Sequence, residues 1–295
     1  MITLKRLNQC TLDEAVGGYN RGFEGYFFDQ SKTADSLAHK LGKEELSPVH
    51  SLVAFHGQEP IGIVLNGIWN RKGKRIAWNG GTGVAPEYRR QGVGQRLMEE
   101  TLQIYREQGV DLAALVAIKE NSKAISLYER MGFRVVGQSI FLESQEWPDS
   151  RFTKENLPYR GEHGIPQDVY RLPFWNEPIW DVQWNTIENR EALLIRDEQE
   201  LVIGYALYRR IYGDNGELST VLLFDAGAHP ERTDADEIIQ YALEGVYASR
   251  DTENASYHRL TVNLPVSNHR VISALERAAF TKMAEQVFMT LEISA

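Results

Sequence analysis

The sequence predicts an α/β protein built from two similar units in tandem, and three observations lead to this fold class. Stretches typical of strands alternate with stretches in which apolar residues recur at helical spacing. The chain has 295 residues, which is more than a single hydrophobic core usually holds. An arrangement of strand pair, turn and helix found in the first half returns in the second half.

The first half of the chain is predicted to alternate between strands and helices. Thr11, with Glu14 three residues later, forms a capping box at the start of the first helix. Glycine-containing turns separate several of the strands. The predicted strands cover residues 2–7, 50–56, 61–69, 75–84, 110–118 and 133–142. The predicted helices cover residues 11–19, 31–41, 92–109 and 122–131.

The first unit is organised around residues 82–95, with the sequence TGVAPEYRRQGVGQ. Gly92 and Gly94 allow a tight turn, and the helix that begins there offers unpaired N–H groups at the positive end of its dipole. Arg89 and Arg90 stand just ahead, where cations oppose the dipole unless an anion is bound. Neither a Walker A loop nor a dinucleotide fingerprint is present. We therefore predict a phosphate-binding cradle of another kind.

The spacing Arg89-x-x-Gly92-x-Gly94 after an apolar strand resembles the pyrophosphate-binding motif of the GCN5-related N-acetyltransferase (GNAT) family. Members of that family use acetyl-coenzyme A. A second stretch, residues 121–133 with the sequence NSKAISLYERMGF, agrees with this resemblance. It has an N-cap, apolar residues at helical spacing and Gly132 placed to end the helix. In the family, this helix lies beside the pantetheine and thiol of the cofactor.

The resemblance implies a mixed, mostly antiparallel twisted sheet flanked by helices, whose strands part near Val84 and Ala85 to admit the cofactor. It implies that the N–H of Val84 bonds to the thioester or pantetheine. Backbone N–H groups of residues 90–95 would bind the pyrophosphate, with charge added by the two arginines. The predicted cofactor-binding residues are Val84, Ala85, Arg89, Arg90, Gln91, Gly92, Val93, Gly94, Gln95, Asn121 and Tyr128.

Tyr128 is the predicted general acid, because a phenol with a pKa near 10 can protonate the departing thiolate. The alternative is a tyrosine that packs in the core. Asn121 is predicted to bond to pantetheine or a bridging water, or to cap the helix, or to do both. No general base is assigned. The candidates are His50, His56, Glu24, Asp29 and an ordered water.

Residues 20–28, NRGFEGYFF, are rich in aromatic side chains and glycine. In the family fold this neighbourhood often faces the acceptor, so the aromatic rings are one candidate lining of the acceptor site. The other interpretation is that they pack the helices onto the sheet. The sequence leaves both open.

The second half of the chain is an internal repeat of the first. An offset of 144 carries Gly83 onto Gly227, and an offset of 147 carries Asn121 onto Asn268. The predicted domains are residues 1–145, catalytic and acetyl-CoA binding, and residues 179–295, a degenerate copy. The proline-rich residues 146–178 between them are predicted to be a linker.

The repeat changes at the positions that carry chemistry in the first half. Arg89, Gly92 and Gly94 map onto Thr233, Asp236 and Ile238, and Tyr128 maps onto Leu275. Asp234 and Asp236 would direct carboxylates at the place where phosphates bind in the first half, and so repel the cofactor. The second copy is therefore predicted to serve the fold, wall the acceptor site, fix a dimer or bind a ligand of its own.

Composition excludes several classes of function. A formal net charge of −9 argues against general nucleic-acid binding and is compatible with a cationic amine substrate. The single cysteine, Cys10, cannot form an internal disulfide, and no Cys/His cluster has metal-ligand spacing. No apolar run is long enough to span a membrane and no signal-peptide core is present, so a cytoplasmic protein is predicted.

The predicted function is transfer of acetyl from acetyl-CoA to a primary amine by direct attack, without a metal. The acceptor partner is predicted to be a small molecule or a peptide. The alternative is a non-catalytic acyl-CoA sensor or scaffold, which needs the cradle but no proton donor at position 128. Either a monomer or a homodimer fits the tandem arrangement.

Overall fold

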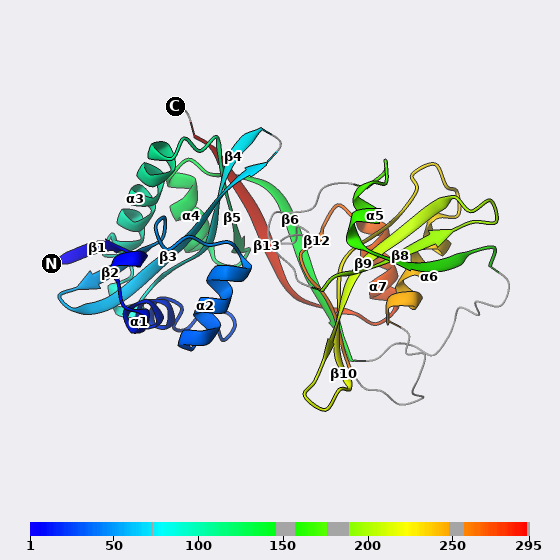
Figure 1. Cartoon of the computed structure of the whole chain (residues 1–295), viewed down its shortest axis with the longest axis horizontal. Coiled ribbons are helices and arrows are strands. Elements are labelled where there is room, and N and C mark those ends of the chain that lie inside the picture. The colour runs from blue at the N-terminus through cyan, green and yellow to red at the C-terminus, as the bar shows by residue number, and fades with distance from the viewer. Residues whose placement is uncertain (72, 146–156, 176–188, 248–256, 294–295) are drawn as a thin grey trace. The chain divides into compact units, whose positions relative to one another are not determined.

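The computed structural model describes residues 1–71, 73–145, 157–175, 189–247 and 257–293. The chain divides into two compact units. The first comprises Met1–Gly137 and Val287–Ala295, and the second comprises Gln138–Gln286. Each unit holds a mixed, mostly antiparallel sheet with helices (Figure 1), which confirms the predicted fold class.

The first unit contains nearly all the elements predicted for the first half of the chain, with ends that shift by a few residues. Its strands are β1 (Ile2–Arg6), β2 (Leu52–His56), β3 (Glu59–Arg71), β4 (Lys74–Val84), β5 (Leu112–Ile118) and part of β13 (Thr281–Glu292). Its helices are α1 (Leu12–Gly22), α2 (Ala34–Lys43), α3 (Val93–Glu107) and α4 (Ser122–Arg130), with 3-10 turns η1 (Leu7–Gln9) and η2 (Pro86–Tyr88). The strand order is β1-β2-β3-β4-β5-β13.

Local sequence signals begin two of these helices. At α1, the Thr11 hydroxyl accepts a hydrogen bond from the Glu14 N–H at 3.2 Å, and the Glu14 carboxylate accepts from the Thr11 N–H at 2.7 Å. The predicted capping box is therefore confirmed. At α2, Thr33 and Ser36 bond in the same reciprocal way. This cap moves the start of α2 to Ala34, three residues later than predicted.

Helices pack on both faces of the first sheet because successive strand residues point to opposite faces. On β2, Leu52 and Ala54 pack in a core with Val93 and Leu97 of α3. Val53 instead faces α1, where a Cβ on Gly18 would lie 3.1 Å from it. A strand buried on both faces explains why this segment reads as a continuous apolar run.

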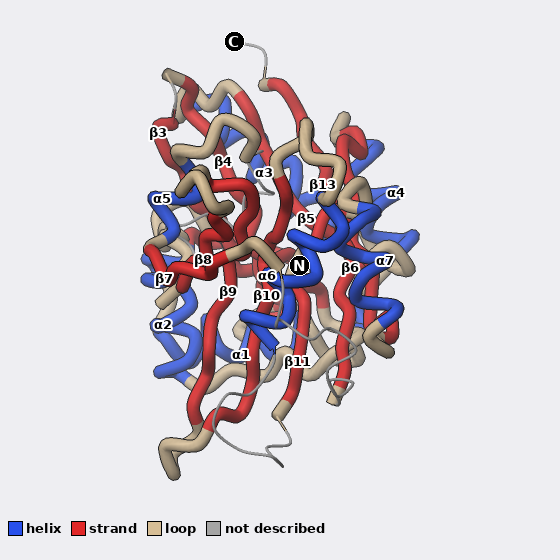
Figure 2. Tube along the Cα trace, turned by 90° about the vertical axis from the view of Figure 1, so that its right-hand side faces the viewer, coloured by secondary structure: helices blue, strands red, loops and turns tan. Residues whose placement is uncertain are grey.

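The second unit repeats the order of elements found in the first. Its strands are part of β6 (Arg134–Ser144), β7 (Arg160–Gly164), β8 (Glu191–Arg196), β9 (Val202–Tyr212), β10 (Leu218–Ala228), β11 (His258–Thr261) and β12 (Leu264–Pro265). Its helices are α5 (Pro166–Tyr170), α6 (Ala235–Tyr247) and α7 (His269–Arg277). The strand order is β6-β11-β10-β9-β8-β7, and β12 pairs with β6 (Figure 2 shows the elements by type).

The offsets inferred from the sequence carry whole elements onto one another. An offset of 144 carries β4 onto β10, and an offset of 147 carries α4 onto α7, end to end. The N-cap residues of the two helices, Asn121 and Asn268, share one backbone conformation, with φ of −81° and −82° and ψ of 60° in both. The repeat is therefore a repeat of structure as well as of sequence.

The two compact units meet at other residues than the boundaries predicted at residues 145 and 178. They meet within β6 and within β13, so that residues 138–144 join the second sheet and the last strand returns to the first unit. Ile140 and Leu142 accordingly lie in the core of the second unit, and Val287 and Met289 lie in that of the first. Sequence patterns mark strands but not the sheet that a strand joins.

Part of the predicted linker is regular structure. Within residues 146–178, the structure describes 157–175, where β7 pairs with β8 along its whole length and α5 buries Val169. These residues belong to the second unit, so an irregular connection is not what the described part forms. The rest of the predicted linker lies outside the described residues.

Candidate active site

The strands β4 and β5 part beside the predicted cradle. They pair in parallel only from Ile76 opposite Leu112 to Asn79 opposite Leu115. Both strands continue beyond that register, β4 to Val84 and β5 to Ile118. On its other edge β4 stays paired with β3 as far as Val84. One edge of the end of β4 is therefore left without its parallel neighbour.

The Val84 N–H points toward that edge. The N–H of Ala85 donates to the carbonyl of Ile61 on β3 at 2.8 Å, and successive N–H groups along a strand point to opposite edges. Val84 lies opposite Gly62 in the pairing with β3. A strand N–H that faces a gap is a donor for an extended ligand such as pantetheine. The position thus agrees with the role predicted for Val84.

The cradle itself is the turn from η2 into α3. Gly92 is the N-cap of α3 with a φ of 80°, and an added Cβ there would meet no atom within 4 Å. Gly94 is enclosed instead, because its Cβ would lie 3.3 Å from Leu127 of α4. Residues 93–95 lie in the first turn of α3, where N–H groups have no intrahelical acceptor. The donors and the open glycine fit an anionic group such as a pyrophosphate.

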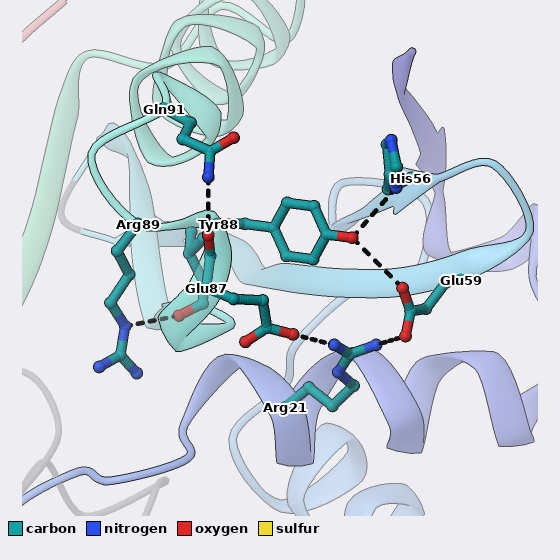
Figure 3. Close-up of polar contacts among 8 residues, drawn as sticks. Arg21, His56, Glu59, Glu87, Tyr88, Arg89 and Gln91 are labelled. Carbon is teal, nitrogen blue, oxygen red and sulfur yellow. Dashed lines mark hydrogen bonds and ion pairs between the residues drawn. The ribbon is translucent and has the colours of Figure 1, made fainter.

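Arg89 and Gln91 bond to backbone carbonyls within and beside the cradle (Figure 3). Arg89 donates from Nε to the Val84 carbonyl at 2.8 Å and from Nη2 to the Glu24 carbonyl at 2.6 Å. Gln91 donates to the Glu87 carbonyl at 2.6 Å. Arg90, with a φ of 63°, is exposed in the same turn. The guanidinium predicted to face the pyrophosphate thus braces the strand end and the segment after α1.

An exposed network of polar side chains connects η2 with the neighbouring α1, β2 and β3 (Figure 3). Arg21 of α1 pairs with both Glu59 and Glu87. The pKa of the Glu87 carboxyl is lowered by a hydrogen bond from its own backbone N–H and, further, by Arg21. Tyr88 contacts Nδ1 of His56 at 3.0 Å and donates to Glu59 at 3.4 Å. Single exposed ion pairs stabilise a fold little, but this network joins four elements beside the cradle, α1, β2, β3 and η2. His56, a candidate base, is engaged here.

The other candidate bases lie in different surroundings. His50 lies in the turn before β2, and burial lowers the pKa of its imidazole, with Arg6 adding to the shift. Asp29 accepts a hydrogen bond from the Ser31 N–H at 2.9 Å. The Ser31 side chain and this N–H together lower the pKa of the Asp29 carboxyl. Glu24 contributes its backbone carbonyl to Arg89. No general base is assigned from these positions.

Tyr128 lies on the face of α4 that turns toward the end of β4. Its side chain is only 6% exposed and packs on Phe133, with ring centroids 6.1 Å apart. Burial raises the pKa of Tyr128 to about 12, while a hydrogen bond with Thr82 acts in the opposite direction. The phenol is therefore protonated throughout the physiological pH range. Tyr128 is thus a buried core residue whose protonated hydroxyl lies beside the strand that bears Val84.

Asn121 caps α4 and also touches the aromatic segment. Its side chain accepts from the Ala124 N–H at 3.2 Å, which confirms the predicted cap. A hydrogen bond between Asn121 and the Tyr26 hydroxyl opposes the rise that burial causes in the Tyr26 pKa. Tyr26 in turn raises the pKa of Tyr128 through their electrostatic interaction. Tyr26 thus belongs to the site, although only its aromatic neighbourhood was singled out from sequence.

The aromatic segment divides between the two interpretations. Phe23 packs, because its ring lies 4.6 Å from that of Tyr19 and 3.1 Å from the place of a Cβ on Gly81. Tyr26 stands edge-on to Phe23 and reaches Asn121. Phe27, at 49% exposed, and its neighbour Phe28 lie open to solvent. Within residues 23–28, the first ring packs against the core and the last two rings are exposed to solvent.

The corresponding turn of the second unit is filled by its own side chains. Asp234, just before α6, accepts from Arg232 at 2.6 Å and from the Tyr159 hydroxyl at 2.6 Å, and its pKa is strongly lowered by Arg232. Asp236 pairs with Arg270 at 2.8 Å. Both carboxylates predicted to repel phosphates are thus paired with arginines.

An apolar side chain also occupies this turn of the second unit. Ile238, which replaces Gly94, is fully buried, and a Cβ on Gly204 would lie 2.3 Å from its side chain. The space between β9 and the start of α6 is therefore filled by an apolar side chain.

Among the described residues, no three His, Cys, Asp or Glu side chains gather as a metal-binding group. Within the same residues, no helix has the length and apolar character needed to cross a membrane.

Comparison with known proteins agrees with this geometry. The family model described as acetyltransferase (GNAT) family matches residues 14–133. Mycothiol acetyltransferase of Propionibacterium freudenreichii is 25% identical over 143 residues, which are 47% of this chain and 45% of that protein. The chain thus spans about half the length of this curated relative.

Several solved structures match along the whole chain, and two of them serve as examples. A GCN5-related N-acetyltransferase from Sphaerobacter thermophilus has a TM-score of 0.65 at 14% identity, covering 100% of this chain and 96% of that one. A tandem GNAT protein from the clavulanic acid biosynthesis pathway has a TM-score of 0.61 at 12% identity, covering 100% and 99%. At such identities these matches show the fold. Residues 14–133 thus match the model of the acetyltransferase (GNAT) family, and the chain as a whole shares the fold of these two solved structures.

Proposed function

We propose that the chain is an N-acetyltransferase that moves acetyl from acetyl-CoA to a primary amine by direct attack. One observation carries the proposal: a buried, protonated phenol lies beside a strand end whose N–H faces a gap, next to an open glycine turn at a helix N-terminus. The phenol is Tyr128, held by Thr82. Transfer of an acyl group from a thioester would use all three features side by side.

The cradle and the strand end would hold the co-substrate. N–H groups of residues 93–95 and of the turn before them would bind the pyrophosphate, supported by the α3 dipole. The Val84 N–H would bond to the pantetheine or to the thioester oxygen, where negative charge develops during attack. Acetyl-CoA supplies an activated acyl carbon with a thiolate leaving group.

Tyr128 would supply the proton. The amine nitrogen bonds to the acyl carbon, the carbon–sulfur bond breaks, the amine loses a proton and the thiolate gains one. With a pKa of about 12, Tyr128 carries its proton at neutral pH, although it is a weaker acid than an exposed tyrosine. Proton donation of this kind contributes about 10²-fold or more to rate.

The alternative function is a non-catalytic acyl-CoA sensor or scaffold. Such a protein needs the cradle but has no use for a phenol at the strand end. The burial of Tyr128 and its bond with Thr82 favour catalysis, because a leucine fills the same place in the second unit. There Leu275 serves packing alone, and it is fully buried.

We further propose that the second unit does not bind coenzyme A, since Ile238 and the Asp234 pairs fill the corresponding turn. The acceptor would be a small-molecule or peptide amine. The first relative named above acts in the chemistry of mycothiol by its name, so thiol-containing amines belong in the acceptor panel. Cytoplasmic location and a monomeric or dimeric state stay predictions.

Calorimetric titration followed by a thiol-release assay tests the proposal. Acetyl-CoA titrated into the chain should give one site per chain. A panel of primary amines should then release coenzyme A thiol only with its acceptor, and mass spectrometry should find the acetylated amine. Binding without turnover on any amine would favour the sensor, and absence of binding would reject both functions.

A further inference from the structure

The segment after α1 is fixed at two points, one on β4 and one on Arg89 of the cradle turn. At its start, Gly22 lies against Gly83, where a Cβ would stand 2.9 Å from the Gly83 carbonyl carbon. Beyond it, the Glu24 carbonyl accepts from Nη2 of Arg89 at 2.6 Å. The first contact is a close approach of two backbones, which depends on glycine. The second depends on one side chain.

Arg89 bridges two carbonyls with two different nitrogens. Its Nε holds the Val84 carbonyl at 2.8 Å, at the end of β4, while Nη2 holds Glu24. The guanidinium is a rigid planar fork, so fixing one nitrogen fixes the direction of the other. Arg89 also precedes the positive-φ residue Arg90 in the cradle turn. A single side chain therefore joins the cradle turn, the strand end and the segment after α1.

This segment carries Tyr26 to the site. The Tyr26 N–H donates to the Phe23 carbonyl at 3.0 Å, closing a turn over Glu24 and Gly25. Gly25 in the middle of that turn has a φ of 67° and is exposed. From here the Tyr26 hydroxyl bonds with Asn121 and acts electrostatically on Tyr128. The position of Tyr26 thus depends on the turn that Arg89 holds.

We propose that Arg89 is a positioning residue that couples the cradle to the segment bearing Tyr26. The proposal rests on the proposed function, because it takes coenzyme A as the occupant of the cradle. An anion bound by the cradle N–H groups restrains the turn from which Arg89 projects, and Arg89 passes that restraint to the Glu24 carbonyl. Binding of coenzyme A then orders residues 23–28, the side of the site nearest the aromatic rings.

Hydrogen exchange of the full chain, with and without coenzyme A, tests the coupling. In the wild type, coenzyme A should slow exchange about tenfold in peptides covering 89–95 and in peptides covering 23–28. In Arg89→Lys the charge is kept, but a single nitrogen cannot hold both carbonyls in this geometry. Coenzyme A should then still slow exchange in 89–95 but no longer in 23–28.

Arg96→Lys is the matched control. Arg96 is an exposed arginine of α3 that also donates to a backbone carbonyl, that of Ile2 at 3.1 Å. Because this carbonyl lies in β1, the variant should behave as the wild type in both peptides. Calorimetry should show that the affinity of Arg89→Lys for coenzyme A falls by less than about threefold, since its contacts go to carbonyls.

The remaining outcomes distinguish failure of the Arg89 coupling from failure of the proposed function. If Arg89→Lys keeps the protection of 23–28, or loses protection in both peptides together with affinity, Arg89 is not the coupling residue. Faster exchange throughout β2 and β3 would show a general loss of stability and also overturn it. If coenzyme A protects neither peptide in the wild type, yet Arg89→Lys alone speeds exchange in 23–28, the proposed function fails and the tie through Arg89 stands.

Discussion

The start of α3 and the start of α6 occupy the same place in the repeat, but one is open and the other is filled. At α3, a side chain on Gly92 would meet open space. At α6, Asp234 is bound by Arg232 and Tyr159, and Ile238 is buried against Gly204. The glycine turn of the first copy is not kept in the second, because Gly92 is an N-cap with a φ of 80° whereas its counterpart Asp236 lies inside α6.

The comparison shows that a helix N-terminus becomes a ligand site through what surrounds it. Both helices have a dipole and unpaired first-turn N–H groups. In the second unit a tyrosine, an arginine and a buried isoleucine take up the surrounding space. In the second copy, packing and ion pairs occupy the place that is open for a ligand in the first.

The largest effect is expected from Gly92→Asp, which places in α3 the residue that α6 has. An aspartate there must adopt a φ of 80° and adds negative charge at the cradle. Affinity for coenzyme A should fall at least about 100-fold through lost backbone approach, strain and repulsion. Calorimetric titration measures this directly.

Gly109→Asp is its control. Gly109 follows the other end of α3, has a φ of 62° and would also place its Cβ in open space. It carries the same strain and charge but lies far along the helix from the cradle, so affinity should change little. Near-wild-type affinity in Gly92→Asp would contradict the cradle assignment.

Tyr128→Phe should lower kcat about 10²-fold with affinity for acetyl-CoA largely kept, if the phenol is the acid. Thiol-release kinetics on the acceptor found in the amine panel give the rate. Tyr105→Phe is the matched control, because Tyr105 is another buried tyrosine, whose hydroxyl donates to Asn66 at 2.6 Å. An equal fall in kcat in both variants would reduce Tyr128 to a packing residue.

Ile238→Ala should destabilise the second unit by about 2–5 kcal/mol, because it opens a cavity in a fully packed wedge. Urea unfolding measures the loss. Calorimetry should still find one coenzyme A site per chain, since Asp234, Arg232 and Tyr159 continue to fill the turn. A second site in this variant would show that one side chain alone separates the two copies.

The smallest effect concerns Asp225, which takes the place of Gly81 of the first unit. Burial raises the pKa of the Asp225 carboxyl to about 6, although Tyr205 donates to it at 2.8 Å and Asn268 at 3.4 Å, and Arg190 lies nearby. Because the folded pKa exceeds the unfolded value, the stabilising contribution is complete below pH 3.8 and is lost as pH rises through about 6.

Replacing Asp225 with Asn should therefore remove a fall in stability of about 3 kcal/mol at most between pH 4 and pH 7. Urea unfolding of both proteins at the two pH values measures it. Asp236→Asn is the control, since this exposed carboxylate pairs with Arg270 and should shift stability by less than about 0.5 kcal/mol at either pH. An unchanged pH dependence in Asp225→Asn would contradict the raised pKa.

Most local structure of the first unit could be predicted from sequence, because its signals act over a few residues. Thr11 and Glu14 bond to each other across one turn, and Gly132 ends α4 with a φ of 95°. The order of elements and the existence of a repeat follow from spacing in the same way. The contacts of Arg89 with Val84 and Glu24 could not, because Glu24 lies 65 residues away and a carbonyl has no sequence signature.

The sequence by itself determined the two-unit α/β architecture, the glycine turn into α3 and the residues at which the second copy departs from it. These depend on backbone conformation, periodicity and residue type, which are local. Only the tertiary structure decided that β13 returns to the first unit, that Asp234 and Asp236 are paired with arginines, and that Tyr26 reaches Asn121. Sheet membership, ion pairing and side-chain contact all depend on which distant segments meet in the folded chain.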